Sequence, residues 1–99
     1  MIVTNGYNVF PLELENIIEG NELVARACVV GVEDPSRGER VKAWIILKEG
    51  VEKTDETKEK IREYCKLNIA KYAMPREIEF IDDFPKTKVG KVDFKQLMK

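Results

Sequence analysis

The sequence predicts an α+β fold, with helices packed on a small antiparallel or mixed sheet and a short hairpin at the start of the chain. Three observations support this prediction. The length of 99 residues fits one domain, which we take as residues 1–99. Apolar side chains recur at every second position in some segments, as they do in strands. In other segments they recur three and four positions apart, as they do in helices.

The first twenty residues predict a hairpin followed by a helix. Asn5-Gly6 lies between short apolar runs, and both residues tolerate the positive φ that a two-residue hairpin turn needs. Pro11 suits the first position of a helix, because an N–H there would have no partner within the helix. We expect this helix to end near Gly20.

The middle of the chain predicts two strands that pair as an antiparallel hairpin. Residues 24–32 are mostly apolar, which is typical of a central strand. Residues 33–39 have the composition of a turn. Beyond this turn, apolar residues at 41, 43, 45 and 47 alternate with the residues at 42, 44, 46 and 48, which include Lys42 and Lys48. We therefore expect the first set to form one buried face of a strand.

The last forty-six residues predict a helix, a short strand, a loop and a final helix. Helical spacing extends over residues 54–72 and places five side chains on one face. These are Ile61, Tyr64, Cys65, Ile69 and Tyr72. Pro75 separates this helix from a strand at 77–81, and residues 82–91 have the composition of a loop. Asp93 can then cap the last helix.

Composition excludes several kinds of site. The chain has no histidine, which excludes a histidine-containing catalytic triad and a His–Cys zinc site within it, and we expect no metal site. We expect Cys28 and Cys65 to be small core residues, not a disulfide or a nucleophile. The net charge of −1 argues against a nucleic-acid partner. No apolar run approaches the length of a membrane span and no signal peptide is evident, so a cytoplasmic location is expected.

Two short stretches are candidates for chemistry, and each also has a purely structural explanation. The turn from Asn5 to Asn8 is either a tight turn alone or a backbone edge that lies against a ligand, since glycine permits close approach. Residues 85–91, Pro-Lys-Thr-Lys-Val-Gly-Lys, open a tail that holds one acid, Asp93, and five lysines. The lysines are Lys86, Lys88, Lys91, Lys95 and Lys99. Such a tail is either solvated surface or a flexible loop that brings an ammonium group to a phosphate or carboxylate. It is no P-loop, because the first glycine and the Ser/Thr after the lysine are absent.

Four segments match a known set of conserved motifs in the right order, over essentially the whole chain. Residues 6–15, Gly-Tyr-Asn-Val-Phe-Pro-Leu-Glu-Leu-Glu, match G-x-N-V-x-P-x-E-I-E, and residues 85–91 match P-K-T-x-[TS]-G-K. Val-Val-Gly-Val-Glu-Asp-Pro at 29–35 and Tyr-Ala-Met-Pro-Arg-Glu-Ile-Glu-Phe at 72–80 follow the same pattern. Together these segments resemble the C-terminal domain of acyl-CoA synthetases of the adenylate-forming superfamily.

The resemblance implies a two-step reaction and a role for Lys91. A carboxylic acid and Mg-ATP form an acyl-adenylate with release of pyrophosphate, and coenzyme A then gives the thioester and AMP. The acid is expected to be a fatty acid. A large N-terminal domain, absent here, holds the ATP and acid sites, and the small domain rotates between the steps. Lys91 matches the tail lysine that enters the active site for adenylation. The fragment alone is expected to be inactive.

For the thioester step, the resemblance places the hairpin loop beside the bound CoA. The loop residues are Asn5, Gly6, Tyr7 and Asn8. Arg37, Lys71 and Tyr72 are further candidates to face the nucleotide of CoA. The chain departs from the family pattern at Val89, where Thr or Ser is usual, and at Phe94 with Lys95, where a pair of arginines is common.

Three alternatives stay open from the sequence. Peptide-synthetase adenylation domains share the expected fold, but Val9-Phe10-Pro11 fits the CoA-ligase branch better. Luciferase-like enzymes share both of the terminal motifs. The chain could also be a stand-alone interaction module that binds a partner and has no catalytic role.

Overall fold

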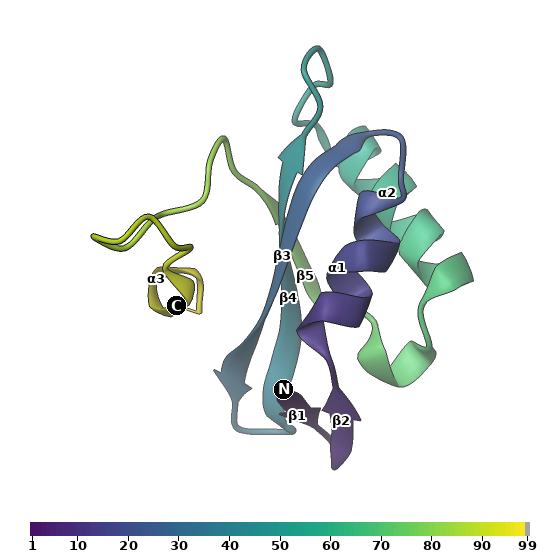
Figure 1. Ribbon diagram of the computed structural model, residues 1–99. Helices are drawn as coiled ribbons and strands as arrows, with labels where there is room; N and C mark the ends of the chain where they lie inside the picture. Colours follow the sequence, from purple (N-terminus) through teal and green to yellow (C-terminus); the bar gives the residue numbers. More distant parts are fainter. Residues whose placement is uncertain (99) are drawn as a thin grey trace.

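A mixed five-stranded sheet forms the centre of the computed structural model, which describes residues 1–98 (Figure 1). Its strands are β1 (Ile2–Thr4), β2 (Tyr7–Val9), β3 (Val24–Asp34), β4 (Gly38–Leu47) and β5 (Glu77–Phe80). The strand order is β2-β1-β4-β3, and β5 runs parallel to β4 beyond the point where β1 ends. The predicted α+β fold and mixed sheet are therefore confirmed.

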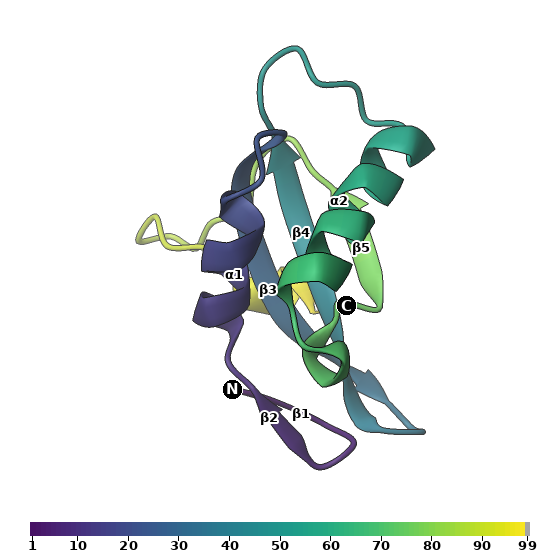
Figure 2. The same ribbon diagram turned by 90° about the vertical axis from the view of Figure 1, so that its right-hand side faces the viewer.

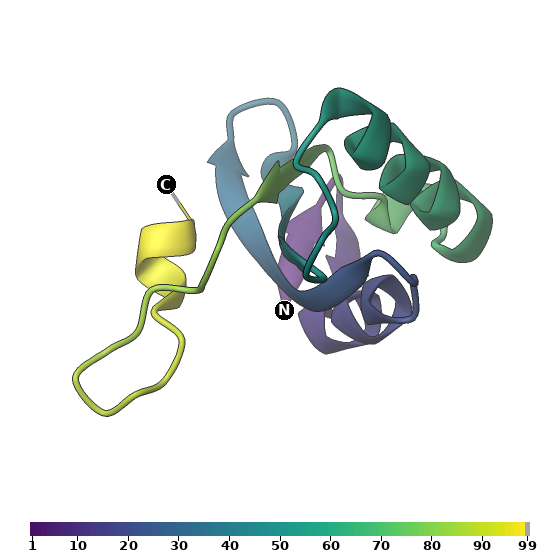
Figure 3. The ribbon, with the colours of Figure 1, turned by 90° about the horizontal axis from the view of Figure 1, so that it is seen from above.

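Two helices cover one face of the sheet, and the C-terminal segment covers part of the other. Helices α1 (Pro11–Glu19) and α2 (Asp55–Asn68) lie on the same side, as the turned view shows (Figure 2). The short helix α3 (Phe94–Leu97) lies on the opposite side (Figure 3). Asp93 caps α3 as expected, since its Oδ1 accepts the N–H of Lys95 at 3.2 Å. None of these helices is long and apolar enough to cross a membrane.

Each face of the sheet carries its own hydrophobic cluster. The larger one lies under α1 and α2 and includes the fully buried Ile18, Ile45 and Ile61. The smaller one, called here the second cluster, consists of Cys28, Val30, Val32, Phe84 and Leu97. Both cysteines are free and buried, one in each cluster, which confirms the prediction of core residues.

The prediction of a central strand over residues 24–32 is wrong, because β3 lies at the edge of the sheet. It is apolar because clusters cover both of its faces. Its free edge is covered by two side chains of α1. Glu19 Oε2 accepts the N–H of Ala27 at 3.0 Å, and Glu15 Oε2 accepts the N–H of Val29 at 2.8 Å. These carboxylates take the place of a neighbouring strand.

Two further expectations need correction. The helix predicted over 54–72 ends at Asn68, and a separate 3₁₀ turn, η1, spans Lys71–Ala73. Ile69 breaks the helix with φ −120° and ψ 138°, so Tyr72 lies on η1 and is half exposed. Lys42, assigned to the less buried face of its strand, is only 5% exposed. It is covered because β5 and Trp44 lie against that side chain.

Candidate functional site

The N-terminal hairpin presents its turn at one end of the domain. Asn5 and Gly6 have φ values of +50° and +80°, and Thr4 pairs with Tyr7, which confirms the predicted two-residue turn. All four residues from Asn5 to Asn8 are exposed. The N–H of Asn5 donates to the carbonyl of Arg37 at 2.9 Å. The hairpin tip is thereby tied to the turn between β3 and β4.

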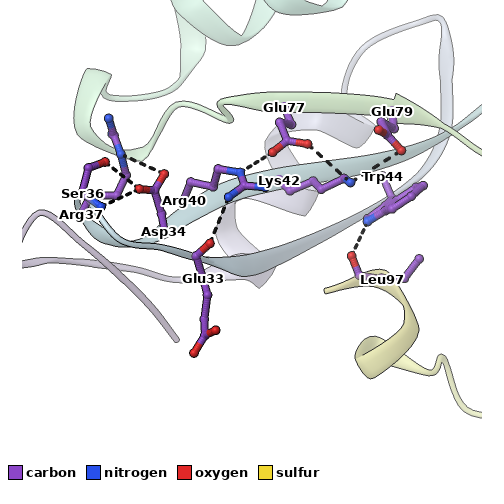
Figure 4. A network of polar contacts seen from close by, with 10 residues as sticks. All are labelled: Glu33, Asp34, Ser36, Arg37, Arg40, Lys42, Trp44, Glu77, Glu79 and Leu97. Atoms are coloured by element: carbon purple, nitrogen blue, oxygen red, sulfur yellow. Dashed lines mark hydrogen bonds and ion pairs between the residues drawn. The ribbon is translucent and has the colours of Figure 1, made fainter. Parts of the chain in front are cut away.

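That second turn holds Arg37 close to an acid. The Ser36 hydroxyl and N–H both donate to Asp34 Oδ1, at 2.6 and 2.9 Å, and these bonds hold the pKa of Asp34 below its ordinary value. Arg37 Nε lies 3.6 Å from Asp34 Oδ2 (Figure 4). Within the described part of the chain, this Nε is buried and has no hydrogen-bond partner. The Nε atom of Arg37 is therefore held against the turn, while the side chain as a whole is 21% exposed.

Two tyrosines from distant parts of the sequence stack beside the hairpin. The rings of Tyr7 and Tyr72 have centroids 4.7 Å apart and planes inclined by 22°. Each residue is about half exposed, at 54% and 50%. Lys71 precedes Tyr72 on η1 and is also exposed. The structure therefore brings most of the predicted CoA-binding residues to one end of the domain.

A pocket of about 510 Å³ continues this surface from η1 toward the end of α2. It is lined by Lys66, Ile69, Lys71, Met74, Pro75 and Arg76. The prediction from sequence missed Lys66 and Arg76. Residues 66–76 contain three cations and no acid, whereas charges of both signs are mixed over the rest of the chain. This local excess of positive charge is the sequence signal that could have pointed to Lys66 and Arg76. A pocket with apolar walls and three cations is suited to a ligand that carries phosphates.

Lys91 follows a tight turn elsewhere on the molecule. Lys86 and Val92 form an isolated bridge, the N–H of Gly90 donates to the Thr87 carbonyl at 3.0 Å, and the N–H of Thr87 donates to the Lys91 carbonyl at 2.7 Å. Gly90 has φ +81°, the left-handed conformation that such a turn requires. We call residues 85–92 the tail turn. It extends away from the sheet, far from the N-terminal hairpin in both views (Figures 1 and 3).

The tail lysines are free of salt bridges. Lys86, Lys88, Lys91 and Lys95 are all exposed, and within residues 1–98 none of them forms an ion pair. Lys99 lies outside the described residues. The ammonium group of Lys91 is therefore available to an incoming anion.

A polar network fastens β5 to β4, between the turn that holds Arg37 and helix α3 (Figure 4). Lys42 Nζ is 3.5 Å from Glu77 Oε2 and 3.6 Å from Glu79 Oε2, and it lies 4.3 Å from the centre of the Trp44 ring. Arg40 pairs with Glu77 and donates to the Glu33 carbonyl at 3.0 Å. The hydrogen bond from Arg40 holds the pKa of Glu77 below its ordinary value. Residues 1–98 contain no cluster of three metal-ligating side chains.

Comparison with known proteins identifies relatives over nearly the whole chain. Residues 13–91 match the family described as the AMP-binding enzyme C-terminal domain. Acetyl-coenzyme A synthetase of Bacillus subtilis is 47% identical over 92 residues, which are 93% of this chain and 16% of that relative. The crystal structure of an acyl-CoA synthetase from Brucella canis matches 97% of this chain and 18% of its own with a TM-score of 0.86 and 38% identity. An amide bond synthetase, McbA from Marinactinospora thermotolerans, matches 98% of this chain and 19% of its own with a TM-score of 0.84 and 30% identity.

Proposed function

The chain belongs to the AMP-binding enzyme C-terminal domain family, and on that premise we propose that residues 1–99 are the mobile C-terminal domain of an acid–CoA ligase. The complete enzyme would convert a carboxylic acid, ATP with Mg²⁺, and CoA to acyl-CoA, AMP and pyrophosphate. The chain spans less than a fifth of the length of the relatives that it matches. The sites for ATP and the acid would lie on a large N-terminal domain. The 99 residues alone would be inactive.

The observation that carries this proposal is the separation of two basic surfaces on one small domain. The tail turn with Lys91 lies apart from the surface formed by the hairpin, η1 and the pocket. A single orientation toward a large domain cannot bring both surfaces to the same active site. Rotation of the domain between the two steps would bring each surface to the active site in succession, as expected of a domain that serves two reactions in sequence.

Lys91 is proposed to act in the adenylation step. Its ammonium group is exposed and unpaired within residues 1–98, and the turn around Gly90 fixes the backbone from which it extends. A positive charge near the acid oxygen and the α-phosphate offsets the negative charge that develops as the acid attacks. Loss of such a preorganised group costs about a hundredfold or more in rate.

The opposite surface is proposed to receive CoA in the second step. The exposed backbone at Gly6 offers a close approach to the pantetheine chain. The Tyr7–Tyr72 stack offers an aromatic face, and Lys66, Lys71 and Arg76 offer charge to the phosphates of the nucleotide. Arg37 would contribute only after separating from Asp34, since the two are paired here.

The test uses the complete gene product that carries this chain. In parallel, residues 1–99 replace the C-terminal domain of the Bacillus subtilis acetyl-coenzyme A synthetase. Pyrophosphate release reports the first step, and thioester formation from preformed acyl-adenylate reports the second. Lys91→Ala should slow the first step about a hundredfold and spare the second. Lys88→Ala removes an equally exposed lysine from the same turn and should change neither step.

The CoA surface is tested with Lys71→Ala, which should raise the KM for CoA and leave pyrophosphate release intact. Lys48→Ala, at an exposed lysine just beyond β4, is the matched control. If Lys91→Ala leaves the first step intact in both proteins, the tail turn is solvated surface and the proposed role is wrong. If a panel of amines captures the acyl-adenylate and CoA does not, the chain serves an amide-forming enzyme, as the likeness to McbA would allow.

A further inference from the structure

The tail turn is attached to the domain through apolar residues near its two ends, including Val92, which packs against the second cluster. Phe84 precedes it and Leu97 follows it, and both are buried in the second cluster, at 3% and 2% exposure. The residues between them from Lys86 to Lys91 are exposed. The position of Lys91 therefore depends on how firmly these two anchors hold.

The second anchor, Leu97, lies on α3, and helical propensity alone does not hold this short helix in place. Helix α3 has four residues, too few to be stable by itself in water. Besides the burial of Leu97, it is held by one hydrogen bond from the sheet. The indole N–H of Trp44 donates to the carbonyl of Leu97 at 2.8 Å (Figure 4). This bond joins the long strand β4 to the last turn of the tail.

The indole itself is fixed in place. Lys42 lies over its ring, and that lysine is buried and held between Glu77 and Glu79 on β5. The donor that holds α3 therefore belongs to the part of the sheet where β4 pairs with both β3 and β5. A phenylalanine would fill most of the same space and could keep the contact with Lys42, but it would have no N–H to donate.

We propose that Trp44 is a positioning residue for adenylation: its indole N–H fixes α3 and thereby the turn that carries Lys91. Trp44 touches no reacting atom, so it acts only through Lys91, and the inference rests on the role proposed above for that lysine. Trp44→Phe should slow pyrophosphate release about three- to tenfold, the factor that corresponds to one net hydrogen bond. The KM values for ATP and the acid should not change, because their sites lie on the other domain. Thioester formation should proceed at the parent rate.

The experiment compares four variants in the complete gene product and in the Bacillus subtilis chimera. They are Trp44→Phe, Lys91→Ala, the double variant and Ile46→Val. Ile46 packs on the same second cluster from the same strand, so its shortening weakens packing there without removing a polar contact. Amide hydrogen exchange at Lys95, Met98 and Asp93 reports the order of the tail without any activity. We expect faster exchange at these amides in Trp44→Phe and parent-like exchange in Ile46→Val.

The double variant distinguishes positioning from a general structural role. If Trp44 acts through Lys91, Trp44→Phe should add no further loss when Lys91 is already alanine. An added loss there, an equal loss in both half-reactions, or unchanged exchange and adenylation would each overturn the inference. The proposed function fails separately, through parent-like adenylation in Lys91→Ala alone. In that case the catalytic role inferred for Trp44 fails as well, because it depends on the role of Lys91.

Discussion

Replacement of Gly90 by alanine tests whether the shape of the tail turn matters for the first half-reaction. Gly90 has φ +81°, and a Cβ added there would meet no atom within 4 Å. The cost of Gly90→Ala is therefore conformational and involves no steric clash. For an L-residue with a side chain, the left-handed conformation costs about 1–2 kcal/mol. That energy lowers the equilibrium constant between the formed and the open turn by a factor of about five to thirty.

The expected result is a loss of adenylation without a loss of the fold. Because residues 86–91 are exposed and none of them belongs to either cluster, the urea midpoint of the domain should barely change. Single-turnover pyrophosphate release should fall in proportion to the population of the formed turn, by up to about five- to thirtyfold. Thioester formation from preformed adenylate should continue at the parent rate.

Gly50 supplies a matched control. It has φ +86° and also has no atom within 4 Å of an added Cβ, but it lies in the loop between β4 and α2. Gly50→Ala imposes the same backbone strain far along the chain from Lys91, so adenylation should not change. Gly90→Asn should recover part of the loss, since asparagine tolerates the left-handed region better than alanine. If Gly90→Ala adenylates at the parent rate, or Gly50→Ala loses as much, the turn geometry is not what positions Lys91.

Three further predictions concern the core, the polar network and the aromatic stack. Burial raises the pKa of the Cys28 and Cys65 thiols to about 11. A thiol reagent at pH 8 should therefore react with the native chain far more slowly than with the unfolded one. Rapid labelling of the native protein would contradict this. Glu77→Gln should lower the free energy of unfolding at pH 7 by about 1 kcal/mol, measured by urea titration, because the amide oxygen can still accept from Arg40 but carries no charge. The pKa of Glu77 is lowered in the folded state from an ordinary value of 4.5, so the stabilisation that Glu77 contributes is complete above pH 4.5 and is lost as the pH falls through the folded pKa. If the difference in unfolding free energy between parent and variant grows on acidification, Glu77 does not stabilise the fold in this way. Tyr7→Leu and Tyr72→Leu should each remove part of the aromatic face proposed to contact CoA. A lost aromatic contact worth about 1 kcal/mol corresponds to a KM for CoA about three- to tenfold higher, with no effect on pyrophosphate release.

Features that depend on neighbouring residues were predictable from the sequence. Asn5-Gly6 determines its own turn through the two φ values that it permits, and Asp93 caps α3 through a bond two residues away. The alternation of apolar residues at 41–47 predicts the buried face of β4, because this pattern depends on a single strand and not on its partners. The antiparallel pairing of β3 with β4 follows from the short turn that joins them.

Features that depend on distant partners were not predictable. The burial of Lys42 requires β5, which comes 35 residues later at Glu77 and pairs in parallel with β4. The edge position of β3 depends on which strands pair with β4, and apolar composition alone does not distinguish an edge strand covered on both faces from a central one. Tyr72 fits the helical period of α2, but Ile69 breaks the helix before it and the ring stacks on Tyr7 instead.

The carboxylates of Glu15 and Glu19 have a consequence for the behaviour of the domain in a crowded solution. A bare edge strand is a template on which another chain can add a strand and begin to aggregate. Here the N–H groups of Ala27 and Val29 are already bonded, and an approaching strand would meet negative charge where it needs free donors. The two glutamates therefore oppose the addition of a strand from another chain at this edge.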